Sequence, residues 1–281
     1  MSAARAPIGV FDSGVGGLTV LAALRRVMPA ERYLYLGDTA RLPYGTKSPQ
    51  TVLRYALQAS ALLVERGVGM LVVACNTAAS FALPALRARY PQLPVIGVVE
   101  PGAAAAAAAS TRQRILVLAT EATVRGGAYQ RVLAAIRPRA EVAALAAPLL
   151  VSLAEEGLTH GPIAAAIVQH YLAPLLSRPR ESAFDCLLLG CTHFPLLADE
   201  IARAVGPSVT VVDSAATTAS AACQLRQGSG AASARGAPAL KLMATDNVER
   251  FAKVGGAFLG EPIEPDQVET VDLAAQLAGS A

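Results

Sequence analysis

Short, continuously apolar runs recur along the chain, and two of them end in cysteine. Leu71-Val72-Val73-Ala74 leads into Cys75, and Leu187-Leu188-Leu189-Gly190 leads into Cys191. A strand that is apolar throughout is typical of a parallel sheet covered on both faces. Because ligands bind beyond the carboxyl ends of such strands, we expect both thiols at the lip of a crevice, exposed and activated. A matched pair of thiols indicates one acid–base group on each side of a substrate.

Strand-like runs alternate with helical stretches throughout the sequence, which predicts βαβ units and mostly parallel sheets covered by helices. The chain has 281 residues, near the ~250–300 at which one core gives way to two domains. The duplicated cysteine segment indicates two similar halves that face each other. The predicted strands are Ile8–Phe11, Tyr33–Leu36, Met70–Ala74, Val95–Val99, Ile115–Ala119, Glu141–Leu145, Cys186–Leu189, Val209–Val212 and Leu240–Ala244.

Two breaker signals mark further boundaries. The alanine-rich stretch from Gly102 to Ser110 favours a packing helix, and the Pro101-Gly102 pair before it predicts a hinge between domains. Gly157, which follows Glu155 and Glu156, predicts the end of another helix.

Composition argues against several classes of partner. The net charge is +3, the basic residues are scattered, and there is no Trp, so nucleic acid is not expected as a primary partner. The apolar stretches are shorter than the ~18–20 residues of a membrane span, and we expect no membrane association. The N-terminus lacks a secretion signal, and the four cysteines form no disulfide framework. These features favour a cytoplasmic protein.

A glycine-rich turn, Asp12-Ser13-Gly14-Val15-Gly16-Gly17, follows the first predicted strand. One interpretation is a dinucleotide-binding turn, with Asp38 at the spacing of the ribose-binding acid. However, Asp12-Ser13 is inserted before the first glycine and Thr19 stands where the third glycine belongs. Asp12 is better placed to accept a proton or hold an ammonium group, and a turn-capping Asx motif is the structural alternative.

Alternative roles for the cysteines are weaker. Cys186 and Cys223 are interpreted as inert, apolar-lined thiols. A metal site at Cys75, Cys191 and His193 lacks any C-x-x-C pair, and so does a disulfide-exchange site. His193, two residues after Cys191, is placed to lower the pKa of that thiol.

A reaction with one acid–base group on each side of the substrate would use the two thiols directly. A pyridoxal-dependent enzyme needs a Schiff-base lysine, yet Lys47, Lys241 and Lys253 all lie outside these motifs. Helix N-termini after both cysteine loops are expected to stabilise a substrate carboxylate as it gains negative charge.

Five segments together resemble the glutamate racemases of the aspartate/glutamate racemase superfamily, from about Ile8 to about Gly260. The matching segments are Gly9–Gly17, Gly37–Ala40 with Pro43-Tyr44-Gly45, Ala74–Ala78, Leu189–Leu196 and Val212–Ala215. The chain departs from the usual family pattern near Thr120, which the family precedes with Gly, and at Phe194, where Tyr is commoner.

The resemblance implies an α/β fold of two similar domains, each a mostly parallel sheet flanked by helices, with the active site in the cleft between them. Residues 1–100 plus 213–268 are expected to form the first domain, which carries Cys75. Residues 101–212 are expected to form the second, which carries Cys191, and 269–281 a C-terminal tail. A homodimer is also expected.

The resemblance also assigns roles by position. It makes Cys75 and Cys191 the catalytic acid–base pair, assisted by Asp12 and His193 respectively, with Glu155 supporting His193. No metal and no cofactor are implied. The substrate-binding residues it implies are Asp12, Ser13, Tyr44, Gly45, Asn76, Thr77, Thr120, Thr192 and His193.

The activity implied is cofactor-independent racemisation of L-glutamate to D-glutamate, which supplies D-glutamate for peptidoglycan. Glutamate, a small molecule, would be the substrate. Two alternatives stay open on the sequence alone: a racemase of aspartate or another acidic amino acid, and a non-catalytic amino-acid-binding protein of the same fold with unreactive thiols.

Overall fold

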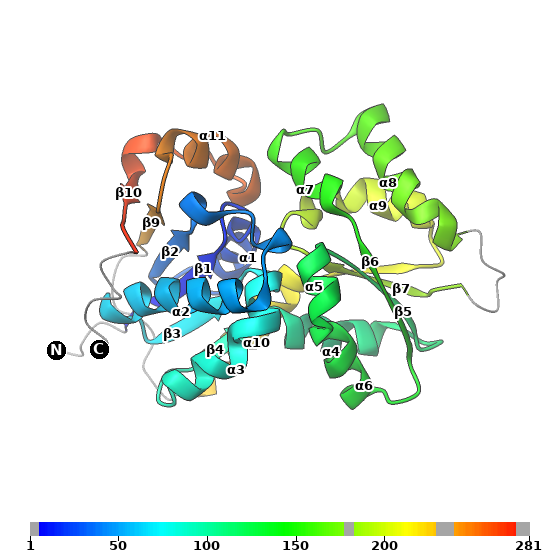
Figure 1. Cartoon of the computed structure of the whole chain (residues 1–281), viewed down its shortest axis with the longest axis horizontal. Helices are drawn as coiled ribbons and strands as arrows, with labels where there is room; N and C mark the ends of the chain where they lie inside the picture. The colour runs from blue at the N-terminus through cyan, green and yellow to red at the C-terminus, as the bar shows by residue number, and fades with distance from the viewer. Residues whose placement is uncertain (1–5, 177–182, 229–238, 274–281) are drawn as a thin grey trace.

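Two parallel sheets organise the computed structural model, which describes residues 6–176, 183–228 and 239–273. The first sheet contains β1 (Ile8–Asp12), β2 (Tyr33–Gly37), β3 (Met70–Val73), β4 (Val95–Gly97), β9 (Leu240–Ala244) and β10 (Val268–Thr270). The second contains β5 (Arg114–Ala119), β6 (Glu141–Ala146), β7 (Cys186–Gly190) and β8 (Thr210–Asp213). The two sheets belong to two lobes that lie side by side, the first on the left and the second on the right (Figure 1).

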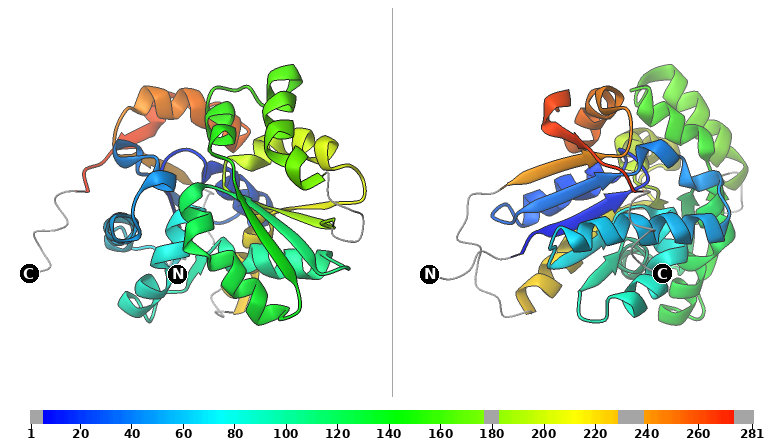
Figure 2. Two further views of the ribbon diagram at one scale, coloured as in Figure 1. Left: turned by 45° about the vertical axis from the view of Figure 1, so that its right-hand side comes forward. Right: turned by 60° about the vertical axis from the view of Figure 1, so that its left-hand side comes forward.

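Helices cover the faces of both sheets (Figures 1 and 2). The first lobe includes α1 (Leu18–Val27), α2 (Pro49–Glu65), α3 (Asn76–Arg89) and α11 (Val248–Leu259). The second includes α5 (Glu121–Gly126), α6 (Ala128–Ile136), α7 (Pro148–Glu155), α8 (Gly161–Leu176) and α9 (Ala198–Val205). Between the lobes run α4 (Val99–Ala109) and α10 (Ser214–Gly228), and short 3-10 turns are η1 (Thr39–Arg41), η2 (Tyr44–Thr46), η4 (Phe194–Leu197) and η5 (Pro265–Gln267).

The apolar strands lie where the sequence predicts them. Every residue of β1, β3 and β7 is buried, as expected for central strands of a parallel sheet with helices on both faces. The predicted strands are confirmed with ends that shift by no more than about two residues, the usual uncertainty of such boundaries. The short strand β10 pairs with β9 and is an addition to the predicted set.

Both sheets share one topology. The first has the order β10-β9-β2-β1-β3-β4 and the second β6-β5-β7-β8, so β6-β5-β7-β8 repeats the arrangement β2-β1-β3-β4. Every neighbouring pair is parallel. Cys75 follows β3 and Cys191 follows β7, the equivalent strand. In each sheet the chain order reverses beside that strand, which is where α/β sheets bind ligands. The predicted fold class is confirmed.

The chain crosses between the lobes twice. It leaves the first sheet after β4 through α4 and returns through α10 to β9. The two crossing helices pack on each other, and a Cβ on Gly102 would lie 3.2 Å from the Cβ of Ser214. The exact domain boundaries stay predictions, and residues 274–281 of the predicted tail lie outside the described part of the chain.

The pair Pro101-Gly102, predicted as a hinge between domains, does lie in a segment that crosses between the lobes, but both residues are inside the continuous helix α4. Pro101 occupies the first turn, where its missing N–H would have had no helical partner. The predicted helix end at Gly157 is confirmed, since α7 ends at Glu155 and Gly157 has a φ of +71°. Among the helices that the structure describes, none has both the length and the apolarity needed to cross a membrane.

A buried ion pair fastens the far end of α10 to the first lobe. Arg226 donates from Nε and Nη2 to the two carboxylate oxygens of Glu31 at 3.1 and 2.9 Å, and also to the carbonyl of Ala6. Both side chains are almost fully buried.

Arg226→Ala is therefore expected to destabilise the fold by about 3–5 kcal/mol, because it breaks a buried ion pair by removing one of its members. Arg66→Ala is the matched control, since the Arg66–Glu269 pair is partly exposed and is worth at most about 1 kcal/mol. Denaturant unfolding of both variants measures the difference. Equal losses in the two variants would contradict the importance of burial.

Candidate active site

One small cavity brings the predicted residues together. Its volume is about 230 Å³, below the ~300–1,000 Å³ of pockets for drug-sized ligands, so it suits a small metabolite. Asp12 lies outside the lining, and every other predicted site residue contributes to it. Those lining residues are Ser13, Tyr44, Gly45, Cys75, Asn76, Thr77, Thr120, Glu155, Cys191, Thr192 and His193.

Cys75 occupies the junction between β3 and α3. Its Sγ accepts a hydrogen bond from the backbone N–H of Ala78 at 3.4 Å and thereby caps α3, and its thiol donates to Ser13 Oγ at 3.6 Å. The side chain is only 5% exposed. Burial, with the neighbouring Asp12 carboxylate, raises the pKa of the Cys75 thiol to about 12. The expectation of an exposed, activated thiol at this position is wrong, because burial outweighs the helix N-terminus.

Asp12 lies at the end of β1 behind Cys75. Its Oδ2 accepts the backbone N–H of Gly14 at 2.9 Å, whereas its buried Oδ1 has no hydrogen-bond partner. Burial raises the pKa of Asp12, although the charge of His193 and nearby backbone N–H groups act in the opposite direction. An unpaired buried carboxylate oxygen beside a thiol can receive a proton or an ammonium N–H.

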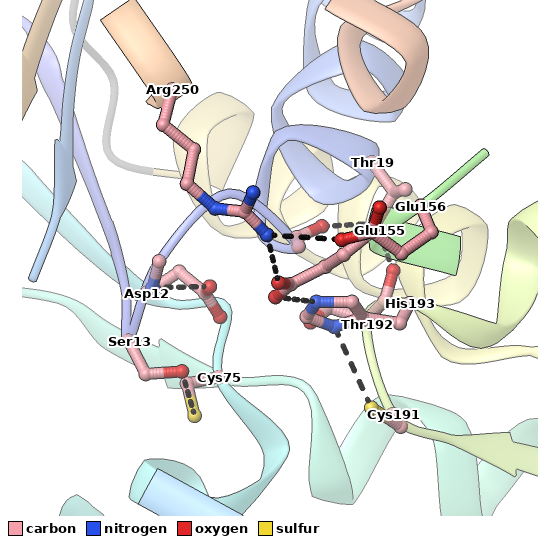
Figure 3. Close-up of polar contacts among 12 residues, drawn as sticks. Asp12, Ser13, Thr19, Cys75, Glu155, Glu156, Cys191, Thr192, His193 and Arg250 are labelled. Atoms are coloured by element: carbon pink, nitrogen blue, oxygen red, sulfur yellow. Dashed lines mark hydrogen bonds and ion pairs between the residues drawn. The ribbon is translucent and has the colours of Figure 1, made fainter. Parts of the chain in front are cut away.

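Cys191 belongs to a hydrogen-bonded chain of side chains (Figure 3). Its Sγ lies 3.8 Å from His193 Nδ1, and His193 Nε2 lies 3.1 Å from Glu155 Oε1. Arg250 Nη2 continues the chain with a contact of 3.3 Å to Glu155 Oε2. Cys191 is buried like Cys75, so exposure was wrongly expected here as well.

His193 supplies positive charge to this chain. Burial lowers its pKa, but the contacts with Cys191 and Glu155 outweigh burial and raise the pKa of His193 to about 10. The same contact with His193 is the main reason that the pKa of Glu155 is lowered. The two thiols therefore occupy equivalent positions in the sheets but opposite electrostatic surroundings.

Polar groups of the cavity wall lie at two helix N-termini, those of α3 and α5. Asn76 Oδ1 accepts from the Tyr129 hydroxyl at 2.6 Å, and its Nδ2 is buried without a partner. The hydroxyls of Thr77, Thr120 and Thr123 form a triangle with 3.0 Å sides. An unused amide N–H₂ and hydroxyls at helix N-termini are groups that bind a carboxylate.

Only the first cysteine loop leads directly into an α-helix. The expected N-terminus after Cys191 is instead the 3-10 turn η4, which begins at Phe194. The prediction of a helix N-terminus behind both thiols is therefore correct for Cys75 alone, while α5 supplies the second N-terminus through Thr120.

The loop after β2 forms another wall. The Tyr44 hydroxyl donates to Asp38, and Arg41 Nε and Thr245 Oγ1 donate to the same carboxylate at 2.7 and 3.1 Å. Asp38 is fully buried and these contacts occupy its carboxylate, which agrees with the preference against a ribose-holding role. A Cβ on Gly45 would lie 3.0 Å from the Cβ of Thr120, so a side chain at this position would press against Thr120.

The glycine-rich turn brings the two lobes into contact. A Cβ on Gly16 would lie 2.5 Å from His193 Nδ1, and one on Gly17 would lie 2.5 Å from the Cβ of Asp12. Thr19 Oγ1 donates to the carbonyl of Thr192 at 3.0 Å. Gly16 therefore allows close approach between the half-sites and Gly17 allows close packing within the first lobe, in place of the phosphate-binding turn that was the alternative interpretation.

Several residues of the site were missed from the sequence. Arg250 reaches Glu155 from α11, 95 residues further along the chain, and no local motif announces such a contact. Glu121 and Ser152 line the cavity, and Thr123 lies behind it. Within residues 6–176, 183–228 and 239–273, no three His, Cys, Asp or Glu side chains gather in a way that could hold a metal ion.

Comparison with known proteins places this chain among amino-acid racemases. The family model described as Asp/Glu/Hydantoin racemase matches residues 16–222. The glutamate racemase of Koribacter versatilis is 44% identical, over 97% of this chain and 99% of that protein. The crystal structure of glutamate racemase from Thermus thermophilus in complex with β-chloro-D-alanine is 42% identical, with a TM-score of 0.85 over 96% of this chain and 98% of that one. The Francisella tularensis glutamate racemase in complex with D-glutamate is 31% identical, with a TM-score of 0.88 over 96% and 99%.

Asp12→Asn is expected to stabilise the protein at pH 7 by about 1 kcal/mol, because it removes a buried charge with an unpaired oxygen. Since the pKa of Asp12 is raised in the folded state, the wild-type residue destabilises the fold only once it ionises. The gain should therefore shrink as the pH falls toward the ordinary Asp value of 3.8. Urea unfolding between pH 3.5 and about 7.5 measures this trend. A variant that is less stable than the wild type at pH 7 would contradict it.

Proposed function

This chain belongs to the Asp/Glu/Hydantoin racemase family and is an amino-acid racemase, and we propose that it interconverts L- and D-glutamate without a cofactor. The observation that carries the proposal is the pair of thiols, Cys75 and Cys191, that line one small cavity from equivalent strands of two sheets. Relatives named glutamate racemase, including one bound to D-glutamate, support the choice of substrate.

The proposed reaction is a proton transfer at Cα. One cysteine, as thiolate, takes the Cα proton, so that the C–H bond breaks and an S–H bond forms. The electron pair left on Cα delocalises into the α-carboxylate. The other cysteine, as thiol, then gives its proton to the opposite face of Cα. When the reaction starts from the other enantiomer, the two cysteines exchange roles. The reaction involves no net oxidation or reduction.

The surroundings of the two thiols suggest how the resting enzyme is protonated. His193 is an imidazolium at neutral pH, and we propose that Cys191 beside it is the thiolate. Cys75 has its pKa raised to about 12 and would be the thiol. In this arrangement the free enzyme is ready to react with the enantiomer whose Cα proton faces Cys191. Turnover with the other enantiomer requires the opposite protonation state, in which Cys75 has given its proton to Asp12 and Cys191 has taken a proton from His193.

Binding of the substrate would position and stabilise the developing charge. We propose that Asn76 and Thr77, at the N-terminus of α3, and Thr120, at that of α5, hold a carboxylate, because donors aimed at accumulating negative charge lower the barrier. Asp12 Oδ1 is the proposed acceptor for the substrate ammonium group. Ser13, Tyr44, Gly45 and Thr192 complete the proposed binding set.

Two alternatives are separated by direct assays. Aspartate is shorter than glutamate by one CH₂, and a single methylene discriminates by only ~1–3 kcal/mol, so both acidic amino acids should be compared as substrates. A non-catalytic binding protein would bind glutamate without exchange of its Cα hydrogen. We favour catalysis because both thiols have ionisable neighbours, Asp12 and His193, that a passive binding site does not need.

In line with the family resemblance, we propose that the reaction supplies D-glutamate for peptidoglycan in the cytoplasm. We also propose a homodimer. Leu149, Leu158 and Ile163 are exposed on and next to α7 and α8, and α8 contains no charged residue. An exposed apolar face without charge can pair with a second copy without burying an unpaired ion.

Replacement of either catalytic cysteine is expected to lower racemisation by at least ~10³-fold, within the range for loss of an acid–base group. Cys75→Ser and Cys191→Ser should keep the wild-type circular dichroism spectrum. Formation of the opposite enantiomer from L-glutamate and from D-glutamate, followed by polarimetry, measures the effect. Cys223→Ser is the control outside the cavity and should retain activity. Full racemisation by either site variant would refute the two-thiol mechanism.

Sedimentation velocity tests the dimer. The wild type should sediment as a dimer at micromolar concentration, and Ile163→Lys should shift it toward a folded monomer, because a lysine at this face buries an unpaired charge on association. A wild-type monomer, or a dimer unaffected by the substitution, would rule out this face as the interface.

A further inference from the structure

Helix α11 belongs to the first lobe but reaches into the second half-site. Asn247, with a φ of 50°, caps it by accepting the backbone N–H of Arg250 at 3.0 Å. This cap fixes the first turn of the helix, on which Arg250 lies. The helix ends at Gly260, whose φ of +82° suits glycine. The side chain of Arg250 therefore projects from a firmly defined position.

Arg250 contacts the carboxylate that supports the catalytic imidazole. Its Nη2 lies 3.3 Å from Glu155 Oε2 and 3.5 Å from Glu156 Oε1, while Glu155 Oε1 contacts His193. Figure 3 shows the guanidinium above Glu155, on the side away from Cys191. Each oxygen of Glu155 thus has a cationic partner, one from each lobe.

A second residue of α11 touches the same imidazole. The Phe258 ring meets His193 edge-on, with centroids 5.0 Å apart and an angle of 76° between the planes. The contact with Phe258 restricts the position of the His193 ring, and the hydrogen bond to Glu155 restricts the rotation of that ring. One helix of the first lobe therefore contacts both the imidazole and its carboxylate partner.

We propose that Arg250 is a positioning residue for the proton transfers at Cys191. It holds Glu155 so that the carboxylate keeps His193 aligned with the Cys191 sulfur, and it does so from the opposite lobe, so the second half-site is complete only when α11 is docked. The proposal rests on the proposed racemase function. Arg250 itself touches neither the thiol nor the cavity.

An ordinary surface ion pair is the alternative role for Arg250, whose side chain is 53% exposed. Such pairs contribute little to stability, so a structural role predicts almost no change in any measurement. A positioning role predicts a loss of rate, since a displacement of ~1 Å in a catalytic group can cost about 10²-fold. For a partner one step removed, we expect Arg250→Ala to lower kcat/KM by about tenfold.

The rate constant alone cannot assign that loss to one thiol. The equilibrium constant of a racemisation is one, so kcat/KM must remain equal for the two enantiomers in any variant. Substrate isotope effects, unlike kcat/KM itself, can differ between the two enantiomers. With glutamate deuterated at Cα, the substrate isotope effect on kcat/KM reports only the removal of the Cα hydrogen, and a different cysteine performs that step for each enantiomer.

The experiment measures substrate isotope effects on both enantiomers for the wild type and Arg250→Ala. The effect should increase for the enantiomer whose hydrogen Cys191 removes, and stay level or decrease for the other. That enantiomer is the one whose Cα hydrogen still exchanges with solvent in Cys75→Ser. Arg250→Lys should recover most of the rate, because lysine keeps the positive charge beside Glu155. The recovery should be incomplete, because lysine lacks the planar fork of the guanidinium.

Two variants serve as controls. Arg25→Ala removes the ion pair with Glu261, just beyond the other end of α11, and does not touch Glu155. Glu156→Gln removes the second partner of Arg250 and leaves Glu155 in place. Both should keep kcat/KM within about twofold of the wild type, since exposed pairs are worth little.

The proposal is overturned if Arg250→Ala keeps the wild-type rate and isotope effects, if it changes both isotope effects alike, or if Arg25→Ala causes the same loss. A wild-type protein that exchanges no Cα hydrogen of glutamate would instead overturn the proposed function. The two failures are therefore distinguishable in one set of measurements.

Discussion

The close approach of the glycine-rich turn to the second cysteine loop is the contact on which the rest of the site depends. Gly16 lies against Thr192 and His193, and Gly17 lies against Asp12. A side chain at Gly16 would push the first lobe away from the second cysteine loop, whereas one at Gly17 would collide with Asp12 and Ala74 inside the first lobe. Because interiors are close-packed and yield little, a separation at Gly16 would widen the cavity and remove the Thr19–Thr192 hydrogen bond. The missing side chain of Gly16 thus helps to set the distance between the two lobes.

Equivalent positions in the two sheets have acquired different chemistry. Cys75 and Cys191 follow equivalent strands, yet an acid lies behind the first and an imidazole–carboxylate pair behind the second. The proposed inversion needs one thiol and one thiolate, and the difference between the half-sites gives each cysteine a proton-exchanging neighbour of a different kind.

The features that depend on local sequence patterns could be predicted from the sequence. Strand positions, the two cysteines and most cavity residues followed from apolar runs, their polar ends and the family resemblance. Burial of Cys75 and Cys191 could not be predicted, because it results from the other lobe and from helices that pack from afar. The same holds for Arg250, which α11 brings to Glu155 from far along the chain. The continuity of α4 through Pro101-Gly102 could not be predicted, because a proline in the first turn of a helix looks the same in the sequence as a proline that interrupts the chain between two elements.

The paired crossings α4 and α10 restrict how the lobes can move. Two helices that pack side by side, with Gly102 against Ser214, resist twisting of one lobe on the other far more than they resist bending across the line that joins them. A rotation of the two lobes about that line would open the cavity for substrate exchange and leave both cores intact.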